Sequence, residues 1–286
     1  MPVRDMLVVV DGTARDENTL ATALAVAGRL KARITALCPL ELLYPGDLAG
    51  AVGAYPQLLV LRDVAGQLDA RLREQAGQIE TSFRQKLVTA GLDGEFEAMD
   101  GAAMDAVATR ARIADLVVIG QAMPDASLPI PASAIIADVL MRSGRPALVV
   151  PFAGKFPVIG RNVLVGWNGT REGARAVHDA LALLEPGARV TVLTVQKGHV
   201  GETEIHKPGE ALAEHLVRHG FAATAARSVS DRSISDSDAL LNFASDLGAD
   251  LLVTGAYGHS RVREIILGGV SNALLDHATL PVLMSH

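Results

Sequence analysis

Two short stretches decide the fold: residues 7–13 read LVVVDGT, and residues 163–170 read VLVGWNGT. Each is a continuous apolar run followed by a polar turn that contains glycine. A continuous run, rather than one that alternates with polar residues, is typical of a strand covered on both faces, as in a parallel sheet. Asp11 and Asn168 hold the same place in the two copies, 157 residues apart. The two halves of the chain are therefore expected to share one fold.

Two later stretches repeat as well. Residues 32–37 (ARITAL) match residues 188–193 (ARVTVL), which lie 156 positions later. Residues 115–120 (DLVVIG) match residues 250–255 (DLLVTG), which lie 135 positions later. The fall in spacing from 156 to 135 means that the first copy holds 21 additional residues between these two stretches.

We place the additional residues in 41–70, where Gly and Pro are frequent. We expect this segment to form a lid or a subunit contact. Residues 151–160 lie between the copies, contain Gly, Pro and Phe, and are typical of a linker. We therefore expect two domains, residues 1–152 and residues 160–286.

Within each copy, short Val, Leu and Ile runs alternate with longer Ala- and Leu-rich segments of helical period. This pattern predicts parallel strands joined by crossover helices. The expected strands are 6–10, 33–38, 94–99, 115–120 and 146–150, then 162–167, 189–195, 222–229, 250–255 and 281–285, with helices at 171–184 and 235–247. The fold class is α/β: two tandem Rossmann-like domains, each a five-stranded parallel sheet with helices on both faces.

Composition excludes several functions. Of the 286 residues, 49% are apolar and only 3% aromatic, which suits helix-on-sheet packing. A net charge of −6 without a basic block argues against nucleic-acid partners. The longest uncharged apolar stretch, residues 48–61, is too short to cross a membrane. Cys38 is the single cysteine, and residues 1–6 lack a charged leader, so we expect a cytoplasmic location.

The richest candidate site follows the fourth strand of the second copy. There Gly255-Ala256-Tyr257-Gly258 is followed by nine residues and then by Gly268-Gly269-Val270-Ser271, which opens a helix-like run to His277. In open α/β sheets, ligands bind beyond the carboxyl ends of the strands. Glycines let backbone N–H groups approach an anion, and a helix N-terminus favours negative charge. The spacing fits a phosphate cradle, or alternatively plain turn residues.

This Gly-x-x-Gly-x9-Gly-Gly motif, followed by a helix and a final Pro-Val-Leu strand, resembles the universal stress protein family. Together with the Asp-Gly-Thr and Asn-Gly-Thr openings, the resemblance covers nearly all of both halves. It implies a tandem member of that family, with the adenine nucleotide alpha hydrolase-like form of the Rossmann fold. It also implies binding of ATP or AMP, with or without Mg²⁺, by a domain that dimerises through its last strand. Because each copy ends in an apolar strand whose edge must be covered, residues 147–150 and residues 281–284, we expect the two halves to pack as an intramolecular pseudo-dimer and the chains to pair further as a homodimer.

The resemblance also implies the site residues. Gly255, Gly258, Gly268, Gly269 and Ser271 would surround the phosphates and ribose, and the backbone of Val195 would meet the adenine. The full candidate set is Trp167, Asn168, Val195, Thr254, Gly255, Tyr257, Gly258, Gly268, Gly269, Val270 and Ser271. Two of these depart from the family pattern. Asn168 stands in place of the usual Asp, which removes an anionic acceptor for the ribose, and Gly269 replaces a frequent Ser or Thr.

The first copy departs further from the motif. Met123, Ser133 and Ala134 occupy the positions of three of the cradle glycines, and Pro39 aligns with Val195. Proline has no N–H to donate, and side chains restrict the backbone geometry that a cradle needs. Asp11 remains, as a turn former or helix cap. We therefore expect one nucleotide site per chain, in the second copy, and a degenerate first copy kept for packing.

Alternative functions rest on weaker signals. His199 with His206, or His215 with His219, offers a pair of metal ligands without a third, so no metal site is assigned. Tyr257 and His259 could contact a nucleotide or simply decorate the loop. No catalytic residue is assigned, because no Walker-type Lys follows the glycines. The expected function is regulation in the stress response without efficient catalysis. The alternatives are a slow ATPase and a partner-binding stress protein without nucleotide.

Overall fold

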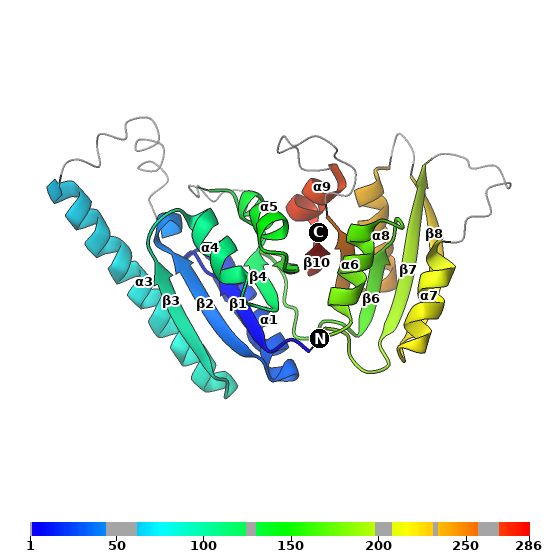
Figure 1. The fold of residues 1–286 in the computed structure, drawn as a ribbon, viewed down its shortest axis with the longest axis horizontal. Helices are drawn as coiled ribbons and strands as arrows, with labels where there is room; N and C mark the ends of the chain where they lie inside the picture. The colour runs from blue at the N-terminus through cyan, green and yellow to red at the C-terminus, as the bar shows by residue number, and fades with distance from the viewer. Residues whose placement is uncertain (1, 44–61, 124–129, 198–207, 231–233, 257–268) are drawn as a thin grey trace.

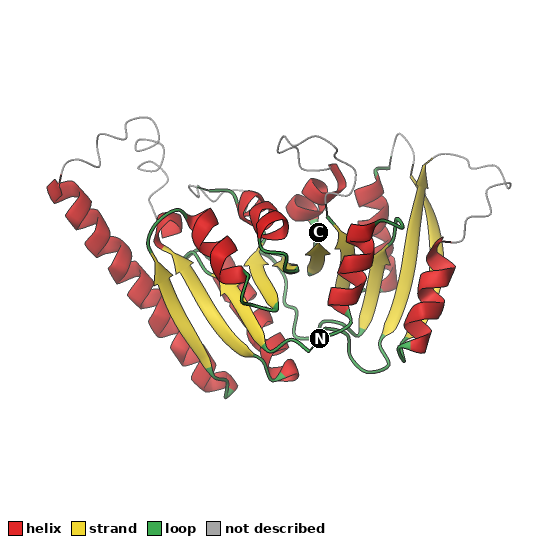
Figure 2. Cartoon of the chain, in the orientation of Figure 1, coloured by secondary structure: helices red, strands yellow, loops and turns green. Residues whose placement is uncertain are grey.

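The strands of both halves form one continuous sheet. A computed structural model describes residues 2–43, 62–123, 130–197, 208–230, 234–256 and 269–286 (Figure 1). The ten strands have the order β3-β2-β1-β4-β5-β10-β9-β6-β7-β8. Each half contributes five parallel strands in the same relative order, and Figure 2 shows helices on both sides of each half. The expected α/β fold with two Rossmann-like halves is confirmed.

The first half contains β1 (Asp5–Val9), α1 (Arg15–Leu30), β2 (Arg33–Pro39), η1 (Leu40–Leu43), α3 (Arg62–Ala90), β3 (Gly94–Met99), α4 (Ala103–Ala111), β4 (Leu116–Gly120), α5 (Ala132–Arg142) and β5 (Ala147–Val150). The second half contains β6 (Asn162–Gly166), α6 (Arg171–Ala180), β7 (Arg189–Lys197), α7 (Pro208–Arg218), β8 (Ala222–Ser230), α8 (Asp236–Leu247), β9 (Leu251–Gly255), α9 (Gly269–His277) and β10 (Val282–Ser285). All ten strands lie where the apolar runs predict them.

Two predicted boundaries were wrong in detail. The helix expected over 171–184 ends at Ala180, because the N–H groups of Leu183 and Leu184 both donate to the Ala180 carbonyl and close a tight turn. Pro186 and Gly187 then prevent continuation. The strand expected to end at Val195 continues to Lys197, since β8 pairs with β7 along nine residues.

The halves meet through their last strands. β5 and β10 pair antiparallel, with Leu148 opposite Leu283 at the centre of the pairing. Leu283 lies 135 residues after Leu148, so a pseudo-two-fold axis passes between them. Both edges of both last strands are used inside one chain. The expected pseudo-dimer of the two halves is therefore confirmed, and a second chain has to pair elsewhere because each last strand already has two neighbours within the chain.

The additional residues of the first half lengthen the connection between β2 and β3. Ile34 corresponds to Val190, 156 residues later, but Gly94 corresponds to Ala223, only 129 later. The insertion is thus larger than the net difference suggests. Part of it lengthens α3 to 29 residues, against 11 in α7. The prediction of a lid or subunit contact falls largely on residues 44–61, outside the described ranges.

Two apolar layers cover the sheet. One contains buried residues of α1, α3, α6 and α7, and the other contains those of α4, α5, α8 and α9. This burial on both faces explains the continuous apolar strands. In the part of the chain that the structure describes, no helix is long and apolar enough to span a membrane.

Candidate functional site

The candidate site lies at the carboxyl ends of β6, β7 and β9. Trp167 and Asn168 directly follow β6, and Thr170 caps α6 by accepting a hydrogen bond from the Gly173 N–H at 3.2 Å. The Asn168 Oδ1 accepts from the backbone N–H of Thr170 at 3.2 Å and from its hydroxyl at 2.9 Å. Asn168 therefore shapes the turn as an Asx motif, while its side chain remains exposed.

Gly255 brings the end of β9 against the start of α6. A Cβ atom at Gly255 would lie 2.5 Å from the backbone nitrogen of Gly173 and 2.6 Å from the carbonyl carbon of Glu172. Only glycine fits this contact, because neither neighbour is a side chain that could move. The preceding Thr254 is buried, and its hydroxyl donates to the Gly255 carbonyl at 3.2 Å. The glycine of the motif thus has a clear packing role.

The remaining candidates divide between described and undescribed residues. Gly269 is exposed at the start of α9, with open space where a Cβ would lie, and Val270 and the buried Ser271 follow it in the first turn. Tyr257, Gly258 and Gly268 lie outside the described residues. The described part of the motif after Ala256 is therefore α9, which begins at Gly269; residues 257–268 are outside it.

Val195 lies on β7, two residues before that strand ends. Its side chain packs against the apolar layer that contains α8 and α9. Any contact with a ligand at the sheet edge would therefore come from the backbone of Val195.

Two polar groups next to this edge have no hydrogen-bond partner among the residues that the structure describes. They are the indole N–H of Trp167 and the hydroxyl of Thr194, both buried. Their strands are adjacent, since the Trp167 backbone N–H donates to the Leu193 carbonyl at 2.8 Å. Buried polar groups without a partner are rare and costly, so each needs an explanation. Sequence analysis picked out Trp167 but missed Thr194, whose signal would have been a polar residue facing the helix layer.

The first half has apolar residues at the same two positions. Val10 precedes Trp167 by 157 residues, and Cys38 precedes Thr194 by 156. Both side chains are fully buried. Burial, together with the nearby carboxylates of Asp16 and Asp11, raises the pKa of the Cys38 thiol to about 12. The thiol is therefore neutral, as expected of a residue that serves packing.

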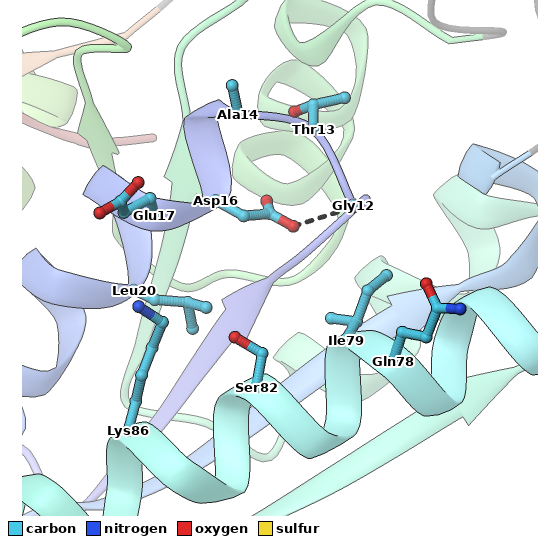
Figure 3. Close-up of a pocket in the computed structure, with 10 residues that line it drawn as sticks. All are labelled: Gly12, Thr13, Ala14, Asp16, Glu17, Leu20, Gln78, Ile79, Ser82 and Lys86. Atoms are coloured by element: carbon cyan, nitrogen blue, oxygen red, sulfur yellow. Dashed lines mark hydrogen bonds between the residues drawn. The ribbon is translucent and has the colours of Figure 1, made fainter.

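The first half also fills its own β1–α1 turn with a carboxylate. The Asp16 Oδ2 accepts from the backbone N–H of Gly12 at 2.8 Å (Figure 3) and from that of Asp11 at 3.0 Å. Arg15 forms a buried ion pair with Asp11 and donates to the carbonyls of Gly120 at 3.2 Å and Gln121 at 3.3 Å. The N–H groups of Asp11 and Gly12 and the carbonyls of Gly120 and Gln121 thus have hydrogen-bond partners among the side chains of the first half itself.

The second half has different residues at these positions. Gly173 corresponds to Asp16 and Glu172 corresponds to Arg15, each 157 residues later. With Gly173 at this position, no carboxylate of the described residues accepts from the N–H groups of the turn after β6. Glu172 is buried and pairs with Arg171. Burial alone would raise the pKa of Glu172, but hydrogen bonds from Arg171, its own backbone and Thr170 outweigh it and lower that pKa.

A cavity of about 400 Å³ lies beside the filled turn of the first half, between α1 and α3 (Figure 3). It is lined by Gly12, Thr13, Ala14, Asp16, Glu17, Leu20, Gln78, Ile79, Ser82 and Lys86. Burial and the neighbouring Asp11 raise the pKa of Asp16 to about 7. Sequence analysis did not predict this cavity, because its α3 wall belongs to the lengthened connection.

The histidine pair considered for metal binding has a third neighbour. The rings of His215 and His219 lie 4.6 Å apart, and His178 on α6 lies 5.8 Å from His215. Desolvation and the nearby His219, His178 and Arg218 lower the pKa of His215. Within the described ranges, no three His, Cys, Asp or Glu side chains are arranged to hold a metal ion. His199 and His206 lie outside those ranges.

The fold and the candidate site together define an α/β protein with two similar halves, which have the same strand order. Residues 160–286 match the model of the universal stress protein family. This match covers the second half of the chain.

Known proteins resemble the chain to different extents. A universal stress protein from Archaeoglobus fulgidus DSM 4304 has the same fold, with a TM-score of 0.72 at 16% identity, covering 99% of this chain and 96% of its own. The universal stress protein Slr1230 of Synechocystis is 37% identical over 46 residues, only 16% of either chain. A Staphylococcus epidermidis relative of the same family name is 25% identical over 142 residues, 43% of this chain and 82% of its own.

Proposed function

We propose that this protein is a tandem universal stress protein, with domains 1–152 and 160–286, that binds one adenine nucleotide per chain in its second half. ATP or AMP, with or without Mg²⁺, would occupy the carboxyl ends of β6, β7 and β9. Occupancy would regulate the protein in the stress response, without efficient hydrolysis. The family match over residues 160–286 supports the assignment of this half.

The observation that carries the proposal is the pair of unpartnered polar groups in the second half, the Trp167 indole N–H and the Thr194 hydroxyl. A purine edge presents an acceptor beside a donor, which the indole N–H and the hydroxyl could satisfy. The corresponding Val10 and Cys38 offer neither. The asymmetry therefore supports one site per chain.

The phosphates would lie nearer to β9 and α9. The N-terminus of α9, with Gly269, Val270 and the buried Ser271, presents backbone N–H groups and the positive end of a helix dipole. The undescribed Tyr257, Gly258 and Gly268 belong to this proposal by their sequence motif alone. Uniform cradling by N–H groups gives affinity without turnover, so we expect hydrolysis to be slow or absent.

The proposal is tested by native mass spectrometry and calorimetric titration of the purified protein with ATP and AMP. We expect a stoichiometry near one per chain. Trp167 is the single tryptophan, so its fluorescence should change on binding. A protein that binds neither nucleotide would favour the alternative, a partner-binding stress protein.

Two near-isosteric variants test the base contact. Trp167→Phe removes the N–H and keeps an aromatic ring, and Thr194→Val removes the hydroxyl. Each should weaken ATP binding about tenfold, the worth of one hydrogen bond to a buried partner. Because pyrophosphate lacks the base, its binding should not change. Gly269→Val is the complementary variant. A Cβ at this position meets open space, so the protein should fold. The added side chain should weaken the binding of both ATP and pyrophosphate.

We further propose a cytoplasmic location, on the basis of the single Cys38, and a homodimer. The last strands are engaged within the chain, so a homodimer needs a different edge.

A further inference from the structure

The ten-stranded sheet has two outer strands, β3 and β8. Among the described residues, β7 is the strand that pairs with β8, and α7 and α8 cover its faces. The Ala222 N–H donates toward β7, to the Ala188 carbonyl at 2.9 Å. Since backbone groups alternate along a strand, those of Ala225, Arg227 and Val229 point away from β7, as does the carbonyl of Ala223, whose N–H donates to the Phe221 carbonyl at 3.1 Å. These groups form a row that another strand can use.

The sequence of β8 does little to prevent such pairing. Its nine residues, AATAARSVS, contain neither proline nor an acidic residue. The single charge, Arg227, is held by Glu210 of α7 at 2.9 Å. Val229 near the strand end is 54% exposed, so an apolar side chain is available at this edge. Outer strands in soluble proteins usually carry charges, prolines or bulges there.

The other outer strand, β3, carries charges that oppose pairing with a second copy. β3 has six residues, GEFEAM, with Glu95 and Glu97. These carboxylates pair with Arg33 and Arg110 within the chain. An antiparallel pairing of β3 with its own copy centred at Phe96 would bring Glu95 opposite Glu97, and one centred at either glutamate would bring that glutamate opposite itself. Like charges in direct opposition are destabilising. Two-fold pairing of two copies is thus disfavoured at β3, whereas no like charges oppose it at β8.

We propose that two copies of this chain pair through β8, antiparallel and with a two-fold axis at Ala226, to form one continuous sheet across the dimer. This register sets Ala226 opposite itself and Arg227 opposite Ala225 of the second copy. Moving the axis to Arg227 would oppose two arginines. The axis at Ala226 also uses all nine residues of the strand, and each half of the interface repeats the other, as closed two-fold symmetry requires.

The first test is the mass of the full chain in solution. Sedimentation or light scattering at micromolar concentration should give twice the chain mass of 29.9 kDa. Ala225→Pro removes an outward N–H and places its ring on the free edge, which an outer strand tolerates. We expect this variant to have the mass of one chain and an unchanged circular dichroism spectrum. The control, Ala98→Pro, makes the same change at an outward position of the other outer strand, β3, and this variant should remain a dimer.

The second test is a disulfide that reads the register. Ala226→Cys places two thiols opposite one another across the axis, within the Cα separation that a disulfide needs. Oxidation should link the two chains, and the native Cys38 is buried and should not interfere. Ser228→Cys lies on the same strand face but opposite Thr224, so it should not cross-link.

Three results would overturn the proposal: a wild-type monomer, an Ala225→Pro dimer, or masses that grow beyond two chains, which would indicate β3-to-β8 filaments. These measurements need no nucleotide. Failure of this pairing and failure of nucleotide binding are therefore distinguishable.

Discussion

The two halves of this protein agree in their sheets and differ at the edges of those sheets. In both, the first strand lies between the second and the fourth, and an Asx turn follows it. At the same edge, the first half satisfies its backbone with Asp16 and Arg15, whereas the second half has Gly173 and Glu172 there. The fold is kept by apolar strand interiors, so the residues just beyond them are free to diverge.

The turn after the first strand serves packing in the first half, and in the second half it is open to a ligand. A half whose turn N–H groups are occupied by its own carboxylate gains rigidity and loses room for an anion. A half that leaves a buried indole N–H and hydroxyl unpartnered carries a cost that a ligand can offset. We read the first half as the self-filled form of the site proposed in the second.

The largest expected effect contrasts two equivalent glycines. Gly255→Ala places a Cβ against immovable backbone at 2.5 Å, whereas Gly120→Ala meets the side chains of Thr19 and Arg15, at 2.6 and 3.0 Å. We expect losses of about 3 kcal/mol for the first and about 1 kcal/mol for the second in chemical denaturation. Gly77→Ala, with nothing near its Cβ, is the control and should stabilise the protein slightly. Equal losses at both glycines would contradict the contrast.

The next prediction converts the second half toward the first. Gly173→Asp introduces the carboxylate that Asp16 provides in the first half, and it should weaken ATP binding about 100-fold by occupying the turn and repelling phosphates. Gly173→Ala controls for bulk, since its Cβ meets the Asn168 Oδ1 at 3.1 Å and the Trp167 ring at 3.4 Å. Titration calorimetry of both variants checks this. Similar affinities for the two would show that size, not charge, matters.

Sequence reasoning located the strands because continuous apolar runs report burial on both faces, and the repeat of LVVVDGT as VLVGWNGT made the symmetry visible. It could not find the self-filled turn, because Asp16 looks like any acidic residue in a first helical turn. The apolar last strands did predict that the two halves pack together within the chain, and the pairing of β10 with β5 confirms it. Which polar groups lack partners depends on tertiary packing, which a linear pattern does not contain.

The third prediction concerns the pH dependence of the first half. The pKa of Asp16 is raised to about 7 by burial and by Asp11, above the value of about 3.9 in the unfolded chain. The unfolded state therefore releases this proton first, and stability falls as the pH rises from about 4 to 7, by at most about 4 kcal/mol. Asp16→Asn keeps an acceptor for the two N–H groups and removes the titration. Denaturation at pH 5 and pH 8 should show a smaller difference for the variant than for the wild type.

The smallest expected effect concerns Asn168. In the first half, Asp11 uses one oxygen for its turn and the other for Arg15, but the second half has Glu172 in place of that arginine. An aspartate at 168 would therefore lack the ion-pair partner that Asp11 has in Arg15. Asn168→Asp keeps the turn and adds an anionic acceptor for a ribose hydroxyl, so ATP should bind about threefold more tightly. Glu172 opposes a larger gain. Titration with 2′,3′-dideoxy-ATP is the control: because it lacks both hydroxyls, a gain of the same size with this nucleotide would show that Asn168 does not lie at the ribose.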